Sequence, residues 1–502
     1  MRGESFPRLS RDRVGWPGLV DIFEPMPPAR ALPIVARRWL TAVAALVVTA
    51  LVAGGSFALG ALVPERELSE GSLAPEPEVQ VADVGRVVPA TMPVPLRIRT
   101  CSVAEALLNE DLGDFSGVVV DPYTGDVLFS RASEALVPPA SVMKIVTGAA
   151  ALAVLGPEMR FSTSVLATDD PARVVLVGGG DSTLSRLATG TPSVYAGAAT
   201  LQDLAEKTIA TAQAGLPEGE RVTITEVVVD ATLWPTEDAF DASWSRDAAS
   251  NGFISSVTAL QVDGDRDNPQ VELSKRGSDP VRRASDEFVN ALRAAGNAGR
   301  YVKVTIGDAP VEGPVLASVE SPPVSYLVRY MMKESDNTVA EMLARHVSLA
   351  QGAGGTAASL ATVIPSVIAG VGLPTEGLVV QDGSGLSRLN QASPSYIAML
   401  LSEVARGDGP LASLRQSLPI AGVDGSLDDR FIGTNAIVHD RVQAKTGSIT
   451  GVRSLAGFVT GADEEPLAFA FFAQGTVGDE TRFAIESLVT AVYGCGSNLA
   501  DF

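Results

Sequence analysis

The segment VQAKTGSITGVRSLAGFVTGADEEPLAFAFFAQG, residues 442–475, decides our prediction of the fold. It contains three runs with strand-like composition, VQAKTGS, VRSLAGFVTG and PLAFAFFAQG, separated by glycine and acidic residues. Such runs bounded by turn residues are typical of consecutive strands. The following DETRFAIESLVTAVYG, residues 479–494, has the apolar spacing of a helix. Residues 442–494 therefore predict three strands followed by a helix.

A strand pair nearer the N-terminus completes this sheet. GVVVDPYTGDVLFSR, residues 117–131, predicts two strands joined by a turn at Asp121–Asp126, where Pro122 and Gly125 interrupt the apolar pattern. SVAEALLNEDLG, residues 102–113, indicates a short helix before them. Together with the three later strands, the pair predicts a five-stranded antiparallel sheet with helices packed on it, which is an α+β fold.

Residues 157–318 separate the two parts of this sheet domain. They alternate strand-like runs, such as RVVLVGGG and RYVKVTIGD, with helical runs such as LQDLAEKTIATAQAG. We therefore expect the sheet domain to comprise residues 99–156 and 319–502. Residues 157–318 are expected to form an inserted accessory domain of the α/β class.

The N-terminal part is expected to anchor the chain in a membrane. Residues 39–63 carry no charge and are long enough to span a hydrocarbon core of about 30 Å. Arginines outnumber acidic residues before this segment, so residues 1–38 are predicted to be a cytosolic basic tail and the body to be extracytoplasmic. Residues 64–98, rich in proline and acidic residues, predict an extended linker. A cleaved signal peptide is the alternative.

Net charge and cysteine content narrow the class of protein. The formal net charge of −21 argues against a nucleic-acid partner, because it repels phosphates. Cys101 and Cys495 are the two cysteines, and an exported protein can join them in a disulfide. Antiparallel packing of the first and last predicted helices would bring them together, whereas two buried free thiols are the alternative. Their spacing is not that of a metal site.

A serine and a lysine lie together in LVPPASVMKIVTG, residues 136–148. The two prolines precede a predicted helix over residues 142–155, so Ser141 stands at its start and Lys144 follows one turn later. A serine hydroxyl becomes a good nucleophile when a neighbouring base removes its proton. An amine serves as that base only when its pKa is lowered from about 10.4. The spacing indicates acyl transfer.

Two further patterns follow in the chain. Ser335-Asp336-Asn337 lies between two predicted helices, and Lys445-Thr446-Gly447 lies on the first of the three late strands. Each pattern alone is weak evidence, since a surface lysine or a helix cap would explain it. Their order is the stronger signal.

Ser-x-x-Lys, Ser-x-Asn and Lys-Thr-Gly in this order resemble penicillin-binding proteins and serine β-lactamases. The long separation of Ser141 from Ser335 resembles, more closely, the low-molecular-mass D-alanyl-D-alanine carboxypeptidase/endopeptidase family, which has a domain inserted between these motifs. LVGGGDSTL, DGSGLSRLN and LPIAGVDGSL are also similar to that family. The resemblance covers roughly residues 101–495 and implies a serine β-lactamase/transpeptidase-like catalytic domain with an inserted α/β domain.

The resemblance also implies roles for individual residues. Ser141 would be the acylated nucleophile and Lys144 its general base. Ser335 would relay a proton to the leaving amine, and Asn337 would hold the substrate amide.

On the strand, Lys445 and Thr446 would hold the terminal carboxylate of the peptide. Gly447 would let the substrate backbone lie against the strand edge. The backbone N–H groups of Ser141 and Ser448 would form the oxyanion hole.

The implied function is a serine DD-peptidase that acts on peptidoglycan stem peptides, releases terminal D-alanine or cuts D-alanyl cross-links, and is acylated by β-lactam antibiotics. No cofactor or metal is expected. A serine β-lactamase is one alternative, but the Glu-x-x-x-Asn element of class A enzymes is absent between residues 337 and 445. An inactive cell-wall-binding module is the other, and it would not require Lys144. His346 and His439 are the two histidines, which disfavours a Ser-His-Asp triad or a histidine-rich zinc site.

Overall fold

The computed structural model describes residues 98–307, 312–407 and 409–501. The predicted basic tail and membrane segment, residues 1–63, lie outside these ranges, as does the predicted linker apart from its last residue. Within the described ranges, no helix has both the length and the apolar character needed to cross a membrane. The anchor and the linker therefore stay predictions.

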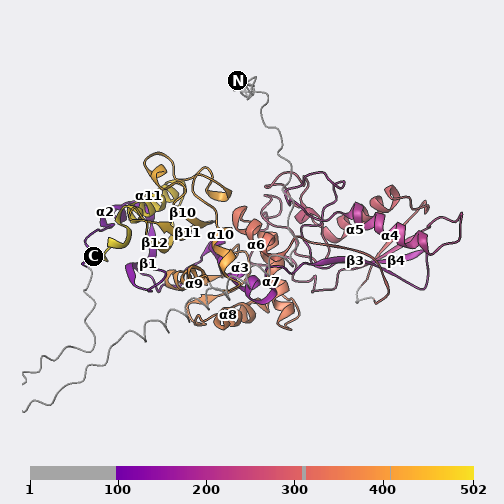
Figure 1. Cartoon of the computed structure of the whole chain (residues 1–502), viewed down its shortest axis with the longest axis horizontal. Coiled ribbons are helices and arrows are strands. Elements are labelled where there is room, and N and C mark those ends of the chain that lie inside the picture. The colour runs from indigo at the N-terminus through magenta and orange to yellow at the C-terminus, as the bar shows by residue number, and fades with distance from the viewer. Residues whose placement is uncertain (1–97, 308–311, 408, 502) are drawn as a thin grey trace, which may run out of the picture. The chain divides into compact units, whose positions relative to one another are not determined.

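A five-stranded antiparallel sheet forms one half of the fold, as the sequence predicted (Figure 1). Its strand order is β10-β11-β12-β1-β2. The strands are β1 (Asp114–Val120), β2 (Val127–Arg131), β10 (Val442–Ile449), β11 (Val452–Thr460) and β12 (Pro466–Gln474). β1 pairs with β12 from Asp114, opposite Gln474, to Val120, opposite Ala468. Segments far apart in the sequence thus share one sheet, and β10 forms one edge.

Both faces of this sheet are covered. Along β12, Phe469 and Phe471 pack in one apolar cluster with α11 (Asp479–Cys495), whereas Phe472 belongs to the cluster on the opposite face. α2 (Ala104–Leu107) lies beside α11, and α9 (Pro394–Arg406) contacts β1 and β12 (Figure 1). Because successive strand residues point to opposite faces, a strand buried on both sides has an almost continuous apolar sequence.

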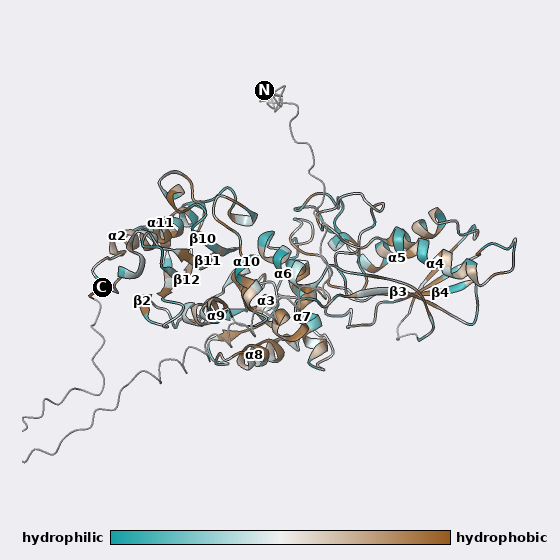
Figure 2. Cartoon of the chain, viewed as in Figure 1, coloured by the Kyte–Doolittle hydropathy of each residue, from teal (hydrophilic) through white to brown (hydrophobic). Residues whose placement is uncertain are grey.

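The other helices of this half pack around α3. α3 (Met143–Leu155) is contacted by α6 (Val324–Lys333), α7 (Asn337–Ala350), α8 (Leu360–Gly370) and α10 (Ala412–Ser417). α8 is largely brown in Figure 2, and its Leu360, Ile364 and Ile368 are buried. Residues 143–152 of α3 are buried without interruption. Lys144 and Thr147 are the polar residues of this stretch, and a helix that is apolar around the rest of its surface belongs in the interior. α3 is therefore a fixed platform for the residues at its start.

A second, mixed sheet lies in the predicted insert. Its order is β6-β5-β4-β3-β7. The strands are β3 (Ser162–Ala167), β4 (Arg173–Val177), β5 (Glu226–Asp230), β6 (Lys303–Ile306) and β7 (Val315–Glu320). β4, β5 and β6 run parallel, whereas β3 is antiparallel to β4 and β7. α4 (Leu201–Ala214) packs on β7 and β3, and α5 (Pro280–Ala294) packs on α4 (Figure 1), which confirms an α/β insert. Its boundaries stay predictions, because all described residues fall in one compact unit.

Residues 231–279, between β5 and α5, form mainly turns and isolated bridges. They pack against the helices around α3. The Trp244 indole N–H donates to Asp382 Oδ2 at 2.7 Å. The Trp234 ring meets His346 of α7 edge-on, with 5.2 Å between ring centroids. The insert therefore contributes side chains to the surroundings of the predicted catalytic residues.

A disulfide joins Cys101 to Cys495, with 5.4 Å between their Cα atoms, as the sequence predicted. Cys101 precedes α2, and Cys495 is the last residue of α11. Backbone hydrogen bonds support the same junction: Cys101 N–H donates to Asn498 O at 3.1 Å, and Ala500 N–H donates to Cys101 O at 2.8 Å. The bond closes a loop with a sequence separation of 394.

Candidate active site

A tight turn places Ser141 at the start of α3. Ala140–Val142 form a 3-10 turn that runs into the helix, and Ala140 has a φ of 49°, a left-handed conformation that alanine rarely adopts. Gly385 packs so closely on this turn that an added Cβ would lie 1.9 Å from Ala140 O. The 3-10 turn and the loop that contains Gly385 therefore together fix the position of the Ser141 side chain.

Lys144 lies directly beneath Ser141. Its Nζ is 3.0 Å from Ser141 Oγ, 2.6 Å from Asn337 Oδ1 and 2.7 Å from Ser384 O. The Asn337 amide nitrogen donates to Phe253 O at 2.8 Å, which turns Oδ1 toward the lysine. Two of the three partners of Nζ are carbonyl oxygens, which can only accept. A neutral Lys144 would donate to both, and its lone pair would face the Ser141 hydroxyl.

The surroundings of Lys144 favour this neutral form. The side chain is fully buried, and burial lowers its pKa from 10.5 to about 8, although the charges of Asp382, Glu341 and Asp336 oppose the shift. An amine with this pKa is available as a base near neutral pH.

Ser335 links the second motif to the third. It has a φ of 57° in the loop between α6 and α7, and its Oγ accepts a hydrogen bond from Lys445 Nζ at 2.9 Å. Lys445 is completely buried and also donates to Thr446 O at 3.0 Å. Burial, and then the charge of Lys144, lower the pKa of Lys445 well below its usual value. Lys445 thus lies below the cleft surface, where it holds Ser335 and its own strand.

Asp336, the middle residue of the second motif, is held by the insert. Its carboxylate caps α7 by accepting from Val339 N–H at 2.9 Å and pairs with Arg266 at 2.8 Å, with both side chains buried. Tyr195 O–H donates to the same carboxylate at 3.1 Å. Burial would raise the pKa of Asp336, but Arg266 and Arg276 outweigh burial and hold it at about 2. A charged carboxylate therefore anchors the loop that carries Ser335.

Gly447 packs against the nucleophile turn. A Cβ there would lie 2.1 Å from Ser454 Oγ and 3.0 Å from Pro139 O, and Ser454 donates to that same Pro139 O at 2.7 Å. The resemblance implied that this glycine makes room for substrate. The structure adds a second reason, because a side chain at residue 447 would push β10 away from Ser141.

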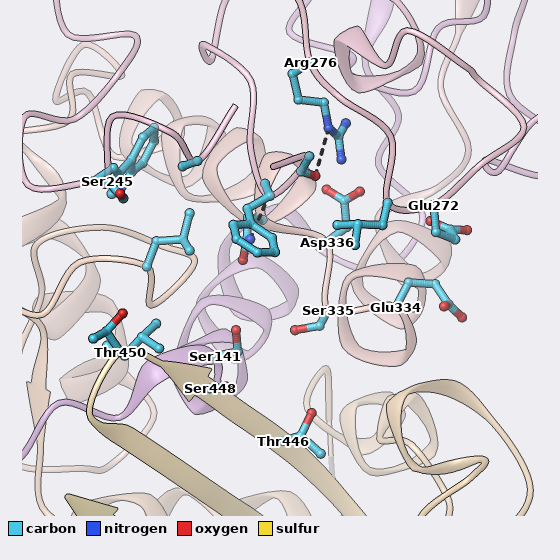
Figure 3. A pocket seen from close by; sticks show the side chains of 18 of the residues that line it. Ser141, Ser245, Glu272, Arg276, Glu334, Ser335, Asp336, Thr446, Ser448 and Thr450 are labelled. Carbon is cyan, nitrogen blue, oxygen red and sulfur yellow. Dashed lines mark hydrogen bonds between the residues drawn. The ribbon is translucent and has the colours of Figure 1, made fainter. Parts of the chain in front are cut away.

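The three motifs meet at one cleft of about 520 Å³. Figure 3 shows Ser141, Ser335, Thr446 and Ser448 around it, from the 3-10 turn before α3, the loop between α6 and α7, and β10. The insert supplies part of the opposite wall, including Ser243, Trp244, Phe253 and Leu273. The cleft lies along the edge strand β10, where an extended peptide can pair with the backbone.

Sequence reasoning assigned no role to the loop DGSGLS, residues 382–387. Ser384 O is a partner of Lys144, and Gly383 and Ser384 donate their N–H groups to buried Glu341 at 3.1 and 2.7 Å. Burial and the neighbouring Asp382 raise the pKa of Glu341. The glycine-rich pattern was visible in the sequence, but its contact with the nucleophile turn was not.

Both histidines lie in packing positions. His346 stacks on Phe161 at 3.6 Å between ring centroids and lies 3.1 Å from Gly180 O through Nε2, and burial lowers its pKa to about 4. His439 Nε2 lies 3.0 Å from Phe431 O.

The model of the D-Ala-D-Ala carboxypeptidase 3 (S13) family matches residues 100–287 and 266–492. The chain belongs to the D-Ala-D-Ala carboxypeptidase 3 (S13) family. The matches of this S13 family span both the sheet domain and the insert, as the resemblance of the motifs predicted.

Individual proteins of this kind align over most of the chain. Carboxypeptidase DacB of Mycolicibacterium smegmatis is 34% identical over 428 residues, which are 84% of this chain and 89% of that protein. D-alanyl-D-alanine carboxypeptidase of an Actinomadura species is 32% identical over 438 residues, covering 73% and 79%. The crystal structure of penicillin binding protein 4 from Haemophilus influenzae has the same fold, with a TM-score of 0.64 at 21% identity, covering 78% of this chain and 99% of that one.

Proposed function

We propose that this member of the S13 family is a serine D-alanyl-D-alanine carboxypeptidase that cleaves peptidoglycan stem peptides through an acyl-enzyme on Ser141. The observation that carries the proposal is the 3.0 Å contact between Ser141 Oγ and Lys144 Nζ. Lys144 has a pKa of about 8 and two carbonyl partners that orient its lone pair toward the serine.

In the acylation step, Lys144 removes the hydroxyl proton while Ser141 Oγ attacks the carbonyl carbon of the penultimate D-alanine. The backbone N–H groups of Ser141 and Ser448 stabilise the oxyanion. Collapse of the tetrahedral intermediate breaks the C–N bond. Ser335 passes its proton to the departing amine, and the proton held by Lys144 replaces it, which restores the neutral Lys144 amine. The hydrogen bond that Ser335 accepts from Lys445 supports this relay.

In the deacylation step, water attacks the ester while Lys144 accepts its proton, and Lys144 passes that proton to Ser141 Oγ as the ester bond breaks. Asn337 holds the substrate amide through the side-chain N–H that is not donated to Phe253 O. Thr446, which lines the cleft, holds the terminal carboxylate from β10, and Lys445 beneath it attracts the same group. β-Lactams present an acyl group and a carboxylate in the same arrangement, so we expect them to acylate Ser141.

Cross-linked stems are a second candidate substrate class. The cleft has a volume of about 520 Å³ and is bounded by side chains of the insert beyond Ser141, which leaves room for more than a terminal dipeptide. Endopeptidase activity on D-alanyl cross-links would use the same acylation step. We place both activities outside the cytosol, on a body tethered by the predicted segment 39–63.

The decisive experiment incubates purified full-length protein with defined muropeptides, one ending in D-Ala-D-Ala and one carrying a D-alanyl cross-link, and identifies the products by mass. The carboxypeptidase reaction releases one D-alanine, whereas the endopeptidase reaction releases two stems. Ser141→Ala should abolish both and also prevent mass gain with penicillin. Activity retained in folded Ser141→Ala would contradict the proposal, as would rapid penicillin turnover without stem cleavage, which is the β-lactamase outcome.

A further inference from the structure

Two carbonyl groups orient the Lys144 amine, and one face of α7 is linked to both. Asn337, the first residue of α7, accepts from Lys144 Nζ through Oδ1 at 2.6 Å. Glu341 follows four residues later, so its side chain projects from the same face of the helix. The second carbonyl is that of Ser384, which accepts from Lys144 Nζ at 2.7 Å. Glu341 is linked to it through the backbone of the loop DGSGLS, residues 382–387.

Both carboxyl oxygens of Glu341 hold this loop. Oε2 accepts from the N–H group of Gly383 at 3.1 Å, and Oε1 accepts from the N–H group of Ser384 at 2.7 Å. Gly383 also packs so closely on the helix that an added Cβ would lie 2.7 Å from Ala344 Cβ. The N–H group and the carbonyl group of Ser384 flank the same Cα atom. A fixed N–H group therefore restricts the direction in which this carbonyl points at Lys144.

Asp382 has a different task in the same loop. It accepts from the N–H groups of Gly385 and Ser387, both at 2.7 Å, so it shapes the loop from within. Glu341 instead joins the loop to α7. Removal of the Glu341 carboxyl group would therefore leave the internal turn of the loop intact but allow the loop to move relative to Lys144.

The burial of the Glu341 side chain requires a reason. It is 3% exposed and is not one of the described residues that line the catalytic cleft, so it acts on the reaction through other residues. Its buried neighbours on α7 include the apolar Val339, Met342 and Leu343. A buried carboxyl group costs free energy, and burial raises the pKa of Glu341 accordingly. An apolar side chain would fill the space at lower cost, but it would not hold two N–H groups.

We propose that Glu341 is a positioning residue for acylation. By fixing the Ser384 carbonyl, it directs the lone pair of Lys144 at the nucleophile. The second motif of this chain accordingly extends from Ser-x-Asn to Ser-x-Asn-x-x-x-Glu, residues 335–341. The inference rests on the proposed function, since it takes Lys144 as the base. It also gives the loop DGSGLS a role, which is to carry the effect of Glu341 to the amine.

The test measures kcat and KM of the full-length protein for an acyl-D-Ala-D-Ala peptide, together with the rate of acylation by a fluorescent penicillin. Glu341→Gln keeps the size of the side chain and one acceptor oxygen, but it places an amide N–H₂ group against an N–H group of the loop. We expect kcat and the acylation rate to fall about ten- to hundred-fold, because a misplacement of about 1 Å has effects of this size. KM should stay nearly unchanged, because the residues that line the cleft are not altered.

A second variant loosens the same loop from α3. Thr147 Oγ1 donates to Gly383 O at 2.6 Å, and Thr147→Val removes this hydrogen bond with little change in volume. It should lower kcat by about two- to ten-fold, as expected for one neutral hydrogen bond, and leave KM nearly unchanged. This variant tests the role of the loop even if Glu341→Gln folds poorly.

The matched control is Ser348→Ala, two turns further along α7. Ser348 is buried, and its Oγ accepts from the N–H group of Gly355 at 3.1 Å. Its removal should lower the denaturant midpoint of unfolding but change neither kcat nor KM. The control therefore separates a loss of stability from a loss of positioning.

The inference is overturned if both loop variants keep the kcat of Ser348→Ala, or if they raise KM while kcat is unchanged. Hydrolysis would then still depend on Ser141. Failure of the proposed function gives a different result, because Ser141→Ala would retain hydrolysis of the peptide.

Discussion

At the scale of single residues, substitution of Lys144 tests whether this residue acts as a general base or only supplies a positive charge. Lys144→Arg keeps a cation but cannot accept a proton near neutral pH. We expect it to lose acylation by a fluorescent penicillin by at least about 10²- to 10⁴-fold, the range typical of general base catalysis. Timed labelling of folded variants measures this.

The matched control for that variant is Lys445→Arg. Its proposed tasks are to donate to Ser335 and to Thr446 O, which a guanidinium can also do, so labelling should be slowed but measurable. Near-normal labelling of Lys144→Arg would show that Lys144 supplies charge rather than basicity.

The pKa of Lys144 also predicts a pH profile. Only the neutral amine accepts the serine proton, and burial lowers this pKa to about 8. The acylation rate should therefore rise with pH, reach half its maximum near pH 8 and level off above it. A rate that falls as pH rises from 6 to 9 would contradict a lysine base. Second-order acylation constants across this range, measured with a stable penicillin, provide the test.

At the scale of elements, the loop between α6 and α7 depends on the insert. Arg266→Met would leave the Asp336 carboxylate buried without its ion-pair partner, which costs about 3–5 kcal/mol. We expect a lower free energy of unfolding and slower penicillin acylation, because Ser335 and Asn337 flank Asp336. Denaturant unfolding and labelling rates measure the two effects.

Two further variants test whether the effect of Arg266→Met comes from the buried ion pair with Asp336. Arg266→Met/Asp336→Asn removes both charges but keeps a side chain that can cap α7, so it should recover most of both losses. Arg282→Met removes an exposed arginine that pairs with Asp286 and should change the stability by less than about 1 kcal/mol. An unaltered acylation rate in Arg266→Met would show that the loop does not need this ion pair.

The sequence predicted those helices and strands whose position follows from hydrophobic periodicity and turn residues. The strands of the five-stranded sheet are confirmed, because their apolar patterns are local. The helix predicted over residues 142–155 is also found, as α3, and it follows the 3-10 turn that carries Ser141. The fit of Gly385 against Ala140 O and the burial of Lys445 were not predictable, because they arise from contacts between segments far apart in the chain. The structural arrangement of residues 231–279 was missed for the same reason, since these residues have little regular structure.

At the scale of the whole molecule, the disulfide between Cys101 and Cys495 should add stability. A loop with a sequence separation of 394 predicts a contribution of about 5 kcal/mol from the reduced entropy of the unfolded chain. Cys101→Ala/Cys495→Ala should therefore unfold at lower denaturant concentration than the oxidised protein and match the reduced wild type. Identical midpoints for the oxidised protein and the double variant would contradict this.

The same bond decides how the protein responds to mechanical tension. Cys101 and Cys495 lie beside each other, so a force applied at residues outside the pair passes through the two sulfur atoms and bypasses both sheets. Pulled in an optical trap from attachment points next to the two cysteines, the oxidised molecule should yield almost no extra length. After reduction, the released span should lengthen the tether by on the order of 1,300 Å, since an extended chain gains roughly 3.3–3.6 Å per residue.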